Sequence, residues 1–529
     1  MNILMICTEK LPVPPVRGGA IQTYIEGVSS FLSKHHDVTI LGTPDPSLPD
    51  DETVNNIRYV RTPGGLVETY MEGVTQFLQS HTFDVIHIFN RPRLVLPVRQ
   101  YASDARLILS MHNDMFIPQK IKPEEAEAAI NELDKIITIS DYVGRTIAES
   151  FPNAASKLKT IYSGVDLDRF VPPNSKEAEK MREAIHQEYD LSYKKVILFA
   201  GRLSANKGAD ILVQAIGEVA KKHPDVALVL VGSKWFSVDD VSDYVAYVRA
   251  LASRLPVPVI NTGFVSPDEI QKWFAAADIF VCPSQWQEPL ARVHYEAMAS
   301  GLPIVTTQRG GNPEVIIPNE NGLIVETPED PLAFAKHLST LLSNPQLGKK
   351  MGQYGRKLAE EKFTWNRVAK DILDVWNEIE EKMKNNVPFG AESKDEELIL
   401  KEVEKTELQA MLEEELEQKE AISMEESQEE NKKIKKREKL KSQLLNELSN
   451  DDFLLEVLLE TVKQRMTENT NDEIQQIIQK LIAEQLSTQE PKKKETPPTR
   501  KIVYSTNDIS TAKLFTNRNN KRRQKRKSN

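Results

Sequence analysis

Short apolar runs alternate with longer amphipathic segments along the first 383 residues of this 529-residue chain. The run Asn2–Cys7 has the composition of a buried strand, and Ala20–His35 has helical periodicity before the next run, Val38–Leu41. Parallel strands need a crossover connection, which is usually a helix. The alternation therefore predicts a mainly parallel sheet that helices cover on both faces. The same pattern predicts further strands at Asp84–Phe89, Arg106–Ser110, Lys135–Ser140 and Lys159–Tyr162.

The alternation restarts in the second part of the chain. The polar stretch Pro172–Asp190 reads as a connection between domains, and a long helical tract ends near Lys384. We therefore predict two doubly wound α/β domains, residues 1–185 and 186–384, which face each other across a cleft at the carboxyl ends of their strands. The strands of the second domain are expected at Lys195–Ala200, Val226–Val231, Val259–Asn261, Ile279–Cys282 and Ile304–Thr307.

The composition changes after Asn385. Residues 385–488 are rich in Glu, Lys and Gln and keep apolar residues at helical spacing, so we predict charged amphipathic helices or short coiled-coil pieces. Residues 489–529 contain several prolines and end in a basic cluster, which predicts a linker and a disordered tail. The alternative is that the whole extension is a solvated, disordered charged segment.

Charge and cysteine content limit the class of protein. The formal net charge is −10, so nothing in the overall charge indicates nucleic acid binding. Cys7 and Cys282 are the only cysteines, which predicts a reducing compartment and no disulfide framework. The first residues lack the features of a signal peptide, and no stretch approaches a transmembrane span. We therefore expect a cytoplasmic protein.

The most informative segment, Ser284–Pro303, carries two glutamates eight positions apart. Glu288 precedes a proline and should be extended, while Pro289 suits the first position of a helix that ends before Gly301. Glu288 would then lie at the helix entrance beside free backbone amides, and Glu296 about two turns further along. A helix start attracts phosphate, and carboxylates accept hydrogen bonds from hydroxyls. The segment therefore favours a sugar nucleotide.

A second candidate site is the loop Gly201–Gly208, between a predicted strand and the predicted helix Ala209–Lys222. It can direct Arg202 and Lys207 at one anionic group, because Arg offers a planar fork for phosphate oxygens and Lys a point charge. The alternative is an ordinary turn with two solvated cations. The presence of the two glutamates at the same sheet edge favours the anion site.

Two weaker signals lie in the first domain. Gly18 and Gly19, between the first strand and the first helix, would let the backbone approach a phosphate, although a flexible turn explains them equally well. His112 follows a predicted strand and can donate to a sugar hydroxyl or shield developing charge, and the alternative is a structural histidine. His87 and His294 have weaker claims, and we expect His87 to be packed.

The turn Arg309–Glu314 joins a predicted strand to a helix, so that Asn312 can cap, Pro313 can open the helix, and the glycines leave space for a ligand. Ser163–Asp166 reads as a turn into the connection between domains. The sequence contains no zinc-type cysteine and histidine set, no Walker motif and no nucleophile elbow. It also lacks a carboxylate-rich metal loop, so we expect no required metal.

Together these motifs resemble glycosyltransferase family 4, over residues 1 to about 383. The resemblance implies the GT-B fold, with two Rossmann-like domains facing each other across a cleft. It also implies retaining transfer of a hexose-type sugar from a nucleotide diphosphate sugar, with no metal or other cofactor. It rests on Glu288-Pro289 followed by Tyr295-Glu296-Ala297-Met298-Ala299, on Gly201-Arg202 with Lys207-Gly208, on Gly310-Gly311 with Pro313-Glu314, and on Gly18-Gly19.

The resemblance also implies roles for individual residues. Arg202 and Lys207 would hold the donor diphosphate, and Glu296 would bind the ribose hydroxyls. Glu288 would hold the transferring sugar, and His112 would contact that sugar from the first domain, so these two are the candidate catalytic residues. The phosphate pocket would be shaped by Gly18, Gly19 and the backbone of Leu290 and Ala291.

The sequence departs from the common family pattern after Glu288. Many members have aromatic or glycine residues there, whereas Arg292 and His294 interrupt the apolar run in this chain. The departure indicates either a changed donor or acceptor, or a site kept mainly for structure.

Three segments, Thr8–Pro14, Gly232–Phe236 and Ser284–Glu296, resemble family members of the bacterial spore coat. That implies a glycosyltransferase in the mother-cell cytoplasm or in the coat, with an unknown glycan or protein acceptor. The alternative is a coat scaffold with a weak or inactive transferase domain, whose extension after Asn385 binds other coat proteins. A sugar-nucleotide epimerase on the same fold is a third hypothesis.

Overall fold

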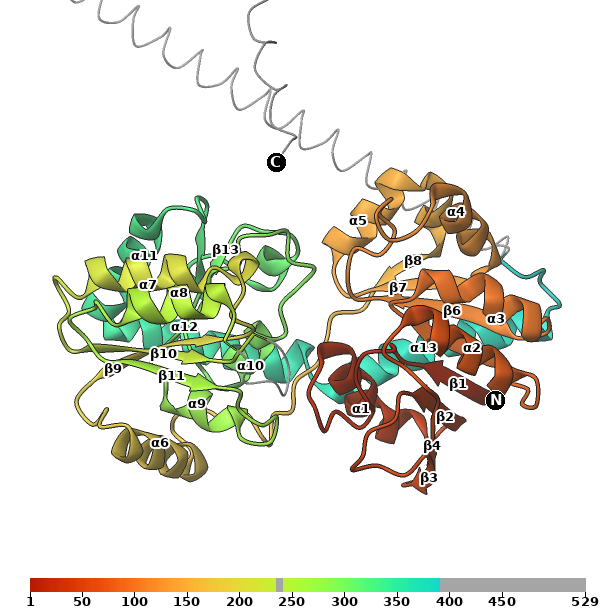
Figure 1. Cartoon of the computed structure of the whole chain (residues 1–529), viewed down its shortest axis with the longest axis horizontal. Helices are drawn as coiled ribbons and strands as arrows, with labels where there is room; N and C mark the ends of the chain where they lie inside the picture. Colours follow the sequence, from red (N-terminus) through yellow and green to blue (C-terminus); the bar gives the residue numbers. More distant parts are fainter. Residues whose placement is uncertain (235–240, 391–529) are drawn as a thin grey trace, which may run out of the picture. The chain divides into compact units, whose positions relative to one another are not determined.

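The computed structural model describes residues 1–234 and 241–390 (Figure 1). The chain divides into two compact units, Met1–Gln409 and Ala410–Asn529, and all described residues belong to the first. The predicted tail and nearly all of the predicted charged helices after Asn385 therefore lie outside the described residues. Of the helices within the described ranges, none combines the length and the apolarity needed to cross a bilayer.

The first sheet has eight strands in the order β3-β4-β2-β1-β5-β6-β7-β8. All neighbours are parallel except β3 and β4, which form an antiparallel hairpin. The order reverses on either side of β1, so the loop after β1 lies at a switch point where ligands bind. The strands are β1 Asn2–Ile6, β2 Asp37–Gly42, β3 Asp51–Val54, β4 Ile57–Arg61, β5 Val85–Phe89, β6 Arg106–Met111, β7 Lys135–Thr138 and β8 Leu158–Thr160.

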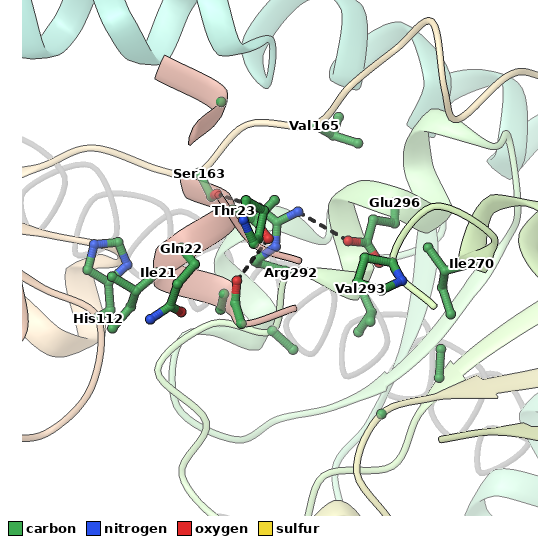
Figure 2. Close-up of a pocket in the computed structure, with 18 of the residues that line it drawn as sticks. Ile21, Gln22, Thr23, His112, Ser163, Val165, Ile270, Arg292, Val293 and Glu296 are labelled. Carbon is green, nitrogen blue, oxygen red and sulfur yellow. Dashed lines mark hydrogen bonds and ion pairs between the residues drawn. The ribbon is translucent and has the colours of Figure 1, made fainter. Parts of the chain in front are cut away.

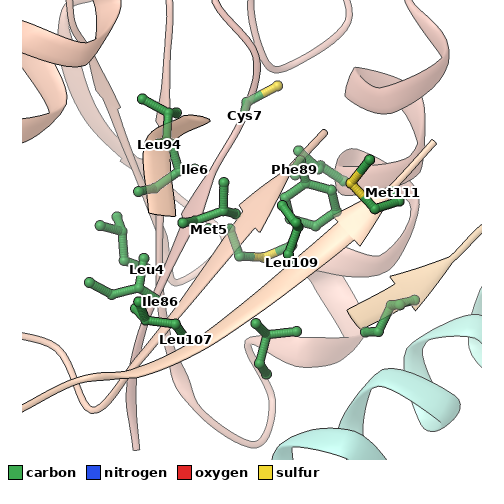
Figure 3. Packing of buried hydrophobic residues seen from close by; sticks show 14 of the residues in the cluster. Leu4, Met5, Ile6, Cys7, Ile86, Phe89, Leu94, Leu107, Leu109 and Met111 are labelled. Carbon is green, nitrogen blue, oxygen red and sulfur yellow. The ribbon is translucent and has the colours of Figure 1, made fainter. Parts of the chain in front are cut away.

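The strands of the first sheet and the helices that pack on it form one hydrophobic core. Figure 3 shows side chains of β1, such as Leu4 and Met5, beside Ile86 of β5 and Leu107 and Leu109 of β6. These side chains are fully buried, as the near-continuous apolar runs of the central strands predict. The helices are α1 Ala20–Leu32, α2 Val67–Leu78, α3 Val95–Tyr101, α4 Pro123–Glu132 and α5 Asp141–Ser150, with short 3₁₀ turns η1 Pro92–Leu94 and η2 Pro152–Lys157.

The second sheet has six parallel strands in the order β11-β10-β9-β12-β13-β14. Its order reverses between β9 and β12, so the loops after these two strands meet at the second switch point. The strands are β9 Lys195–Ala200, β10 Val226–Val231, β11 Val259–Gly263, β12 Ile279–Cys282, β13 Ile304–Thr307 and β14 Gly322–Val325. The remaining helices are α6 Lys176–Glu188, α7 Ala209–Val219, α8 Asp243–Ala252, α9 Ile270–Ala276, α10 Val293–Ala299, α11 Pro331–Ser343, α12 Pro345–Lys362 and α13 Trp365–Lys384, with 3₁₀ turns η3 Ala205–Lys207 and η4 Asn312–Val315.

The predicted mainly parallel α/β architecture is confirmed, and every predicted strand is present. The predicted connection at Pro172–Asp190 contains a helix that was not predicted, because α6 occupies most of it. Ser175 caps this helix by accepting a hydrogen bond from the Ala178 amide, and Arg182 bonds Asp278 and the end of α9. Ala178 and Ile185 are the buried apolar residues of α6, and the cap and the Arg182–Asp278 ion pair stabilise the helix.

Helix α13 carries the chain back to the first sheet (Figure 1). Val368, Ile372 and Trp376 belong to the core of that sheet, which confirms the predicted apolar face. Beside its start, the amide of Val165 donates to the Phe363 carbonyl at 2.8 Å, so the two segments that connect the sheets run together. The exact borders of the predicted domains, at residues 185 and 384, stay predictions.

Candidate functional site

A cavity of about 1100 Å³ is lined by loops of both sheets. It lies at the carboxyl ends of the strands. The β1–α1, β9–α7 and β12–α10 loops follow the strands at the two switch points and lie around the cavity. The structure therefore brings together nearly all of the predicted site residues. Those that line the cavity are Gly19, His112, Arg202, Lys207, Glu288, Leu290, Ala291 and Glu296. Gly18 is the one predicted site residue that does not line it.

Glu288 is buried, with 7% of its surface exposed, and its carboxylate accepts three hydrogen bonds. Lys207 Nζ lies 2.5 Å from Oε2, and the same oxygen accepts from Trp286 Nε1 at 2.8 Å and Ser284 Oγ at 3.0 Å. Burial alone would raise the pKa of Glu288. The Lys207 charge and the three donors outweigh burial and bring that pKa below its ordinary value, so the carboxylate is charged at neutral pH.

The two strongest sequence signals thus meet in one ion pair. Lys207 ends the short η3 turn, and Gly208 follows with a left-handed φ of 68°. A Cβ at Gly208 would lie 2.0 Å from the Pro283 carbonyl oxygen, so this position admits only glycine. Arg202 lies in the same loop and lines the same cavity.

The prediction of a helix that begins at Pro289 is wrong, because α10 begins at Val293. Glu296 is therefore in the first turn of α10, and Glu288 lies in an irregular loop rather than at a helix entrance. Tertiary hydrogen bonds hold this loop. Ser140 Oγ donates to the Pro289 carbonyl at 2.7 Å, and the Ala291 amide donates to Asn312 Oδ1 at 3.1 Å. The predicted helix end is confirmed, since Gly301 follows α10 with φ 66°.

The glycines of the Arg309–Glu314 turn do not leave space for a ligand, contrary to the prediction. Gly311 N donates to the Glu288 carbonyl at 2.8 Å, and a Cβ at Gly310 would lie 2.0 Å from that oxygen. Asn312 does not cap a helix either, because its side chain accepts from the Ala291 amide. This turn therefore holds the Glu288 loop in place through hydrogen bonds to its backbone.

Glu296 also has a cationic partner, which was not predicted from the sequence. Arg292, four residues earlier, places Nη2 3.2 Å from Glu296 Oε1. Both side chains line the cavity, with 16% and 13% of their surfaces exposed (Figure 2). The spacing of four residues at a helix start is a signal that could have found this pair.

His112 reaches the cavity from the end of β6. Its backbone amide donates to Asn90 Oδ1 at 3.1 Å, and its ring packs edge-on against Tyr24 with centroids 4.8 Å apart. Burial, and then the positive charge of Arg292, lower the pKa of His112 to about 3. The ring is therefore neutral at physiological pH and can donate or accept a hydrogen bond.

Two other histidines are structural. His87 Nε2 lies 2.7 Å from Ser110 Oγ inside the first core, which confirms that His87 is packed. His294 is fully buried between the Ala291 carbonyl and Thr306 Oγ1, each at 2.8 Å. His294 is therefore inaccessible to a ligand, and Arg292 is the polar residue of this turn that reaches the cavity.

Comparisons with known proteins agree with these motifs. A model described as glycosyl transferases group 1 matches residues 181–358, and one described as glycosyltransferase family 4 matches residues 18–169. Spore coat protein SA of Bacillus subtilis is 45% identical over 376 residues, which cover 71% of this chain and 99% of that protein. The chain belongs to glycosyltransferase family 4. Another Bacillus subtilis protein, YtcC, is 41% identical over 379 residues, with 72% of this chain and 92% of that protein covered.

The fold of this glycosyltransferase matches solved GT-B structures. The Anabaena protein HepE in complex with UDP and glucose has a TM-score of 0.58 and 20% identity, with 71% of this chain and 99% of HepE covered. A glycosyltransferase from Rickettsia africae has a TM-score of 0.60 and 21% identity, with 71% and 98% covered. The predicted GT-B fold is thereby confirmed.

The remaining points about the predicted site of this glycosyltransferase concern Gly19, the partners of Glu288 and metal ligands. Gly19, with φ 109°, is the residue before α1, and a Cβ there would lie 2.2 Å from Gln22 Oε1. Two partners of Glu288, Ser284 and Trp286, were not predicted, because the loop that brings them to one carboxylate has no regular secondary structure. Within residues 1–234 and 241–390, no three His, Cys, Asp or Glu residues are grouped to hold a metal ion.

Proposed function

We propose that this glycosyltransferase transfers a hexose-type sugar from a nucleotide diphosphate sugar to a glycan or protein acceptor, with retention of configuration and without a metal. The observation that carries the proposal is the pair of charged carboxylates in one cavity, Glu288 beside Lys207 and Glu296 beside Arg292. A donor of this kind offers hydroxyls to the carboxylates and a diphosphate to the cations.

Five residues that line the cavity have roles in this proposal. Glu296 binds the ribose hydroxyls, Arg202 and Lys207 hold the diphosphate, and Glu288 positions the transferring sugar with His112 opposite. When the sugar–phosphate bond breaks, negative charge develops on the leaving diphosphate and positive charge on the anomeric carbon. Fixed cations stabilise that state more than the ground state, and losing one such contact should raise the barrier by roughly 3–4 kcal/mol.

Retention and the nucleotide need separate tests. Retention of configuration is typical of the family that these motifs resemble, and a proton NMR spectrum of the fresh product would test it. The nucleotide is open, because HepE was solved with UDP, whereas a 29% identical mycobacterial relative is named as a GDP-mannose-dependent mannosyltransferase.

The decisive test is calorimetric titration of the full chain with UDP-, GDP- and ADP-sugars, compared with Glu296→Ala. We expect saturable binding of one donor and weaker binding by the variant. Absence of binding for all donors, together with absence of hydrolysis, would contradict the proposal.

A role in the spore coat is the second part of the proposal, supported by the 45% identity to spore coat protein SA. We place the enzyme in the mother-cell cytoplasm or in the coat. The rival candidate is a scaffold whose extension after Asn385 docks on other coat proteins or an anionic polymer. Deletion of the extension separates the two, because an enzyme would keep its activity while a docked scaffold would lose its attachment to the coat.

A further inference from the structure

Arg292 lies in the middle of the cavity, at the position where this chain departs from its family. Its Nη2 contacts Glu296 at 3.2 Å and its Nη1 lies 3.5 Å from Ser163 Oγ, while its guanidinium carbon is 5.5 Å from the centroid of the Trp365 ring. Figure 2 shows the side chain between His112 on one side and Glu296 on the other. Burial lowers the pKa of His112, and the charge of Arg292 lowers it further.

The guanidinium keeps donors for a ligand. Among the described residues its hydrogen bonds go to Ser163 and Glu296, one from each terminal nitrogen. Arginine has five N–H groups in a fixed planar fork. The remaining donors of Arg292 belong to a side chain that lines the cavity, so they are available for a planar or tetrahedral anion.

The neighbours of Arg292 indicate which part of a donor it meets. On the proposed function, Glu296 binds ribose while Glu288 and His112 hold the transferring sugar. The diphosphate is the part of a nucleotide diphosphate sugar between ribose and sugar. A cation between His112 and Glu296 therefore lies where the diphosphate must pass, together with Arg202 and Lys207 of the β9–α7 loop.

We propose that Arg292 is a donor-recognition residue that binds the diphosphate, exchanging its ion pair with Glu296 for the phosphate oxygens. The inference rests on the proposed function and adds a residue that contacts the diphosphate and is not part of the family motifs. The exchange leaves Glu296 able to accept hydroxyls of the ribose. Arg169 also lines the cavity and its pKa responds to the charges of both Glu296 and Arg292, so a second cation stays near the carboxylate.

The alternative is that Arg292 only supports the segments that connect the two sheets, through Ser163 and Trp365. A supporting residue would affect binding of every part of the donor equally. A residue that binds the diphosphate would affect binding of the diphosphate alone. The two possibilities therefore differ in a ratio of affinities.

The experiment compares a nucleoside diphosphate with its own nucleoside on the full chain. Wild type is first titrated with UDP, GDP and ADP, and the base that binds is used with its nucleoside in competition measurements. We expect Arg292→Leu to weaken binding of the diphosphate by roughly 10- to 100-fold, and binding of the nucleoside by less than about 3-fold. Glu296→Gln is the matched control with the opposite pattern. It should weaken binding of the nucleoside at least as much as binding of the diphosphate, because both contain the ribose and the diphosphate no longer has to break an ion pair.

Three results would overturn the inference. Equal losses for diphosphate and nucleoside in Arg292→Leu would mean that Arg292 acts only through Glu296 or the connecting segments. Unchanged binding of both ligands would mean that it meets no part of the donor. Failure of the wild type to bind any of the three diphosphates would overturn the proposed function and this inference together, and that failure is visible before any variant is made.

Arg292→Lys keeps the test open if Arg292→Leu does not fold. Lysine retains the charge but not the fork, so the diphosphate should weaken several-fold while the nucleoside is unchanged. An unchanged ratio of the two affinities in a folded Arg292→Lys would also contradict a phosphate contact made through the fork.

Discussion

The two carboxylate–cation pairs of the cavity differ in how firmly the fold holds them. In Lys207–Glu288 the carboxylate is buried and the lysine half-buried, with Nζ and Oε2 2.5 Å apart, and Ser284 and Trp286 donate to the same oxygen. Arg292–Glu296 is longer, at 3.2 Å, and joins two residues four apart at a helix start. A pair surrounded by further donors is preorganised, whereas a pair with unused donors can exchange partners with a ligand. The first pair thus shapes the site, and the second is suited to respond to the donor.

Removal of Lys207 should have the largest effect on stability. Lys207→Met leaves a charged, buried Glu288 without its cation, and breaking a buried pair in this way costs about 3–5 kcal/mol. The free energy of unfolding, measured by urea denaturation, should fall by that amount, and donor binding should be lost. Lys221→Met is the matched control, because Lys221 pairs with Glu218 on the surface and should cost less than about 1 kcal/mol. A similar small loss in both variants would contradict a preorganised pair.

The next effect comes from the turn that supports the Glu288 loop. Gly310→Ala places a Cβ 2.0 Å from the Glu288 carbonyl oxygen at a φ of 57°, so the loop must move. We expect a loss of about 1–3 kcal/mol in the free energy of unfolding, together with weaker donor binding. Gly65→Ala is the control, since Gly65 also has a left-handed φ but has no atom within 4 Å of an added Cβ. Equal donor affinity in both variants would show that the loop does not depend on this turn.

The protonation of His112 tests the position of Arg292, because the charge of Arg292 is the second cause, after burial, of the low pKa of this ring. Its pKa in the folded protein, about 3, lies below the ordinary value of 6.5, so the unfolded chain binds more protons between these values. The stability that a neutral His112 contributes is therefore complete above pH 6.5 and declines as the pH falls toward 3. The ring resonances of His112 in NMR spectra should stay constant from pH 7.5 to about 4.5. A midpoint near 6.5 would contradict this, and Arg292→Leu should raise the midpoint.

The smallest effect on stability is expected for the second pair. Glu296→Gln should change the free energy of unfolding by less than about 0.5 kcal/mol, because ion pairs four residues apart on one helix contribute little. Its donor affinity should nevertheless fall, as in the calorimetric test. Glu360→Gln, which disrupts the surface pair with Arg356, is the stability control. A loss above about 2 kcal/mol for Glu296→Gln would show that both pairs are held equally firmly.

Much of the fold followed from local patterns. The strands of both sheets were predictable because parallel strands buried on two faces read as apolar runs, and α13 because its apolar face repeats at helical spacing. The hairpin of β3 and β4 was missed, although Asn55 and Asn56, with φ of 51° and 63°, form the type of turn that joins such strands. Helix α6 was missed because few of its residues are buried.

The site divides in the same way. The sequence by itself determined the residue types, their order along the chain and their place at strand ends, because these depend on neighbouring positions. Only the tertiary structure decided that Lys207 meets Glu288 across 81 residues and that Ser140 and Gly311 hold the Glu288 loop out of a helix. Local preference favoured a helix start at Pro289, but hydrogen bonds from distant segments to the Glu288 and Pro289 carbonyls compete with helix formation. Such contacts form only once both sheets are folded, so no window of the sequence contains them.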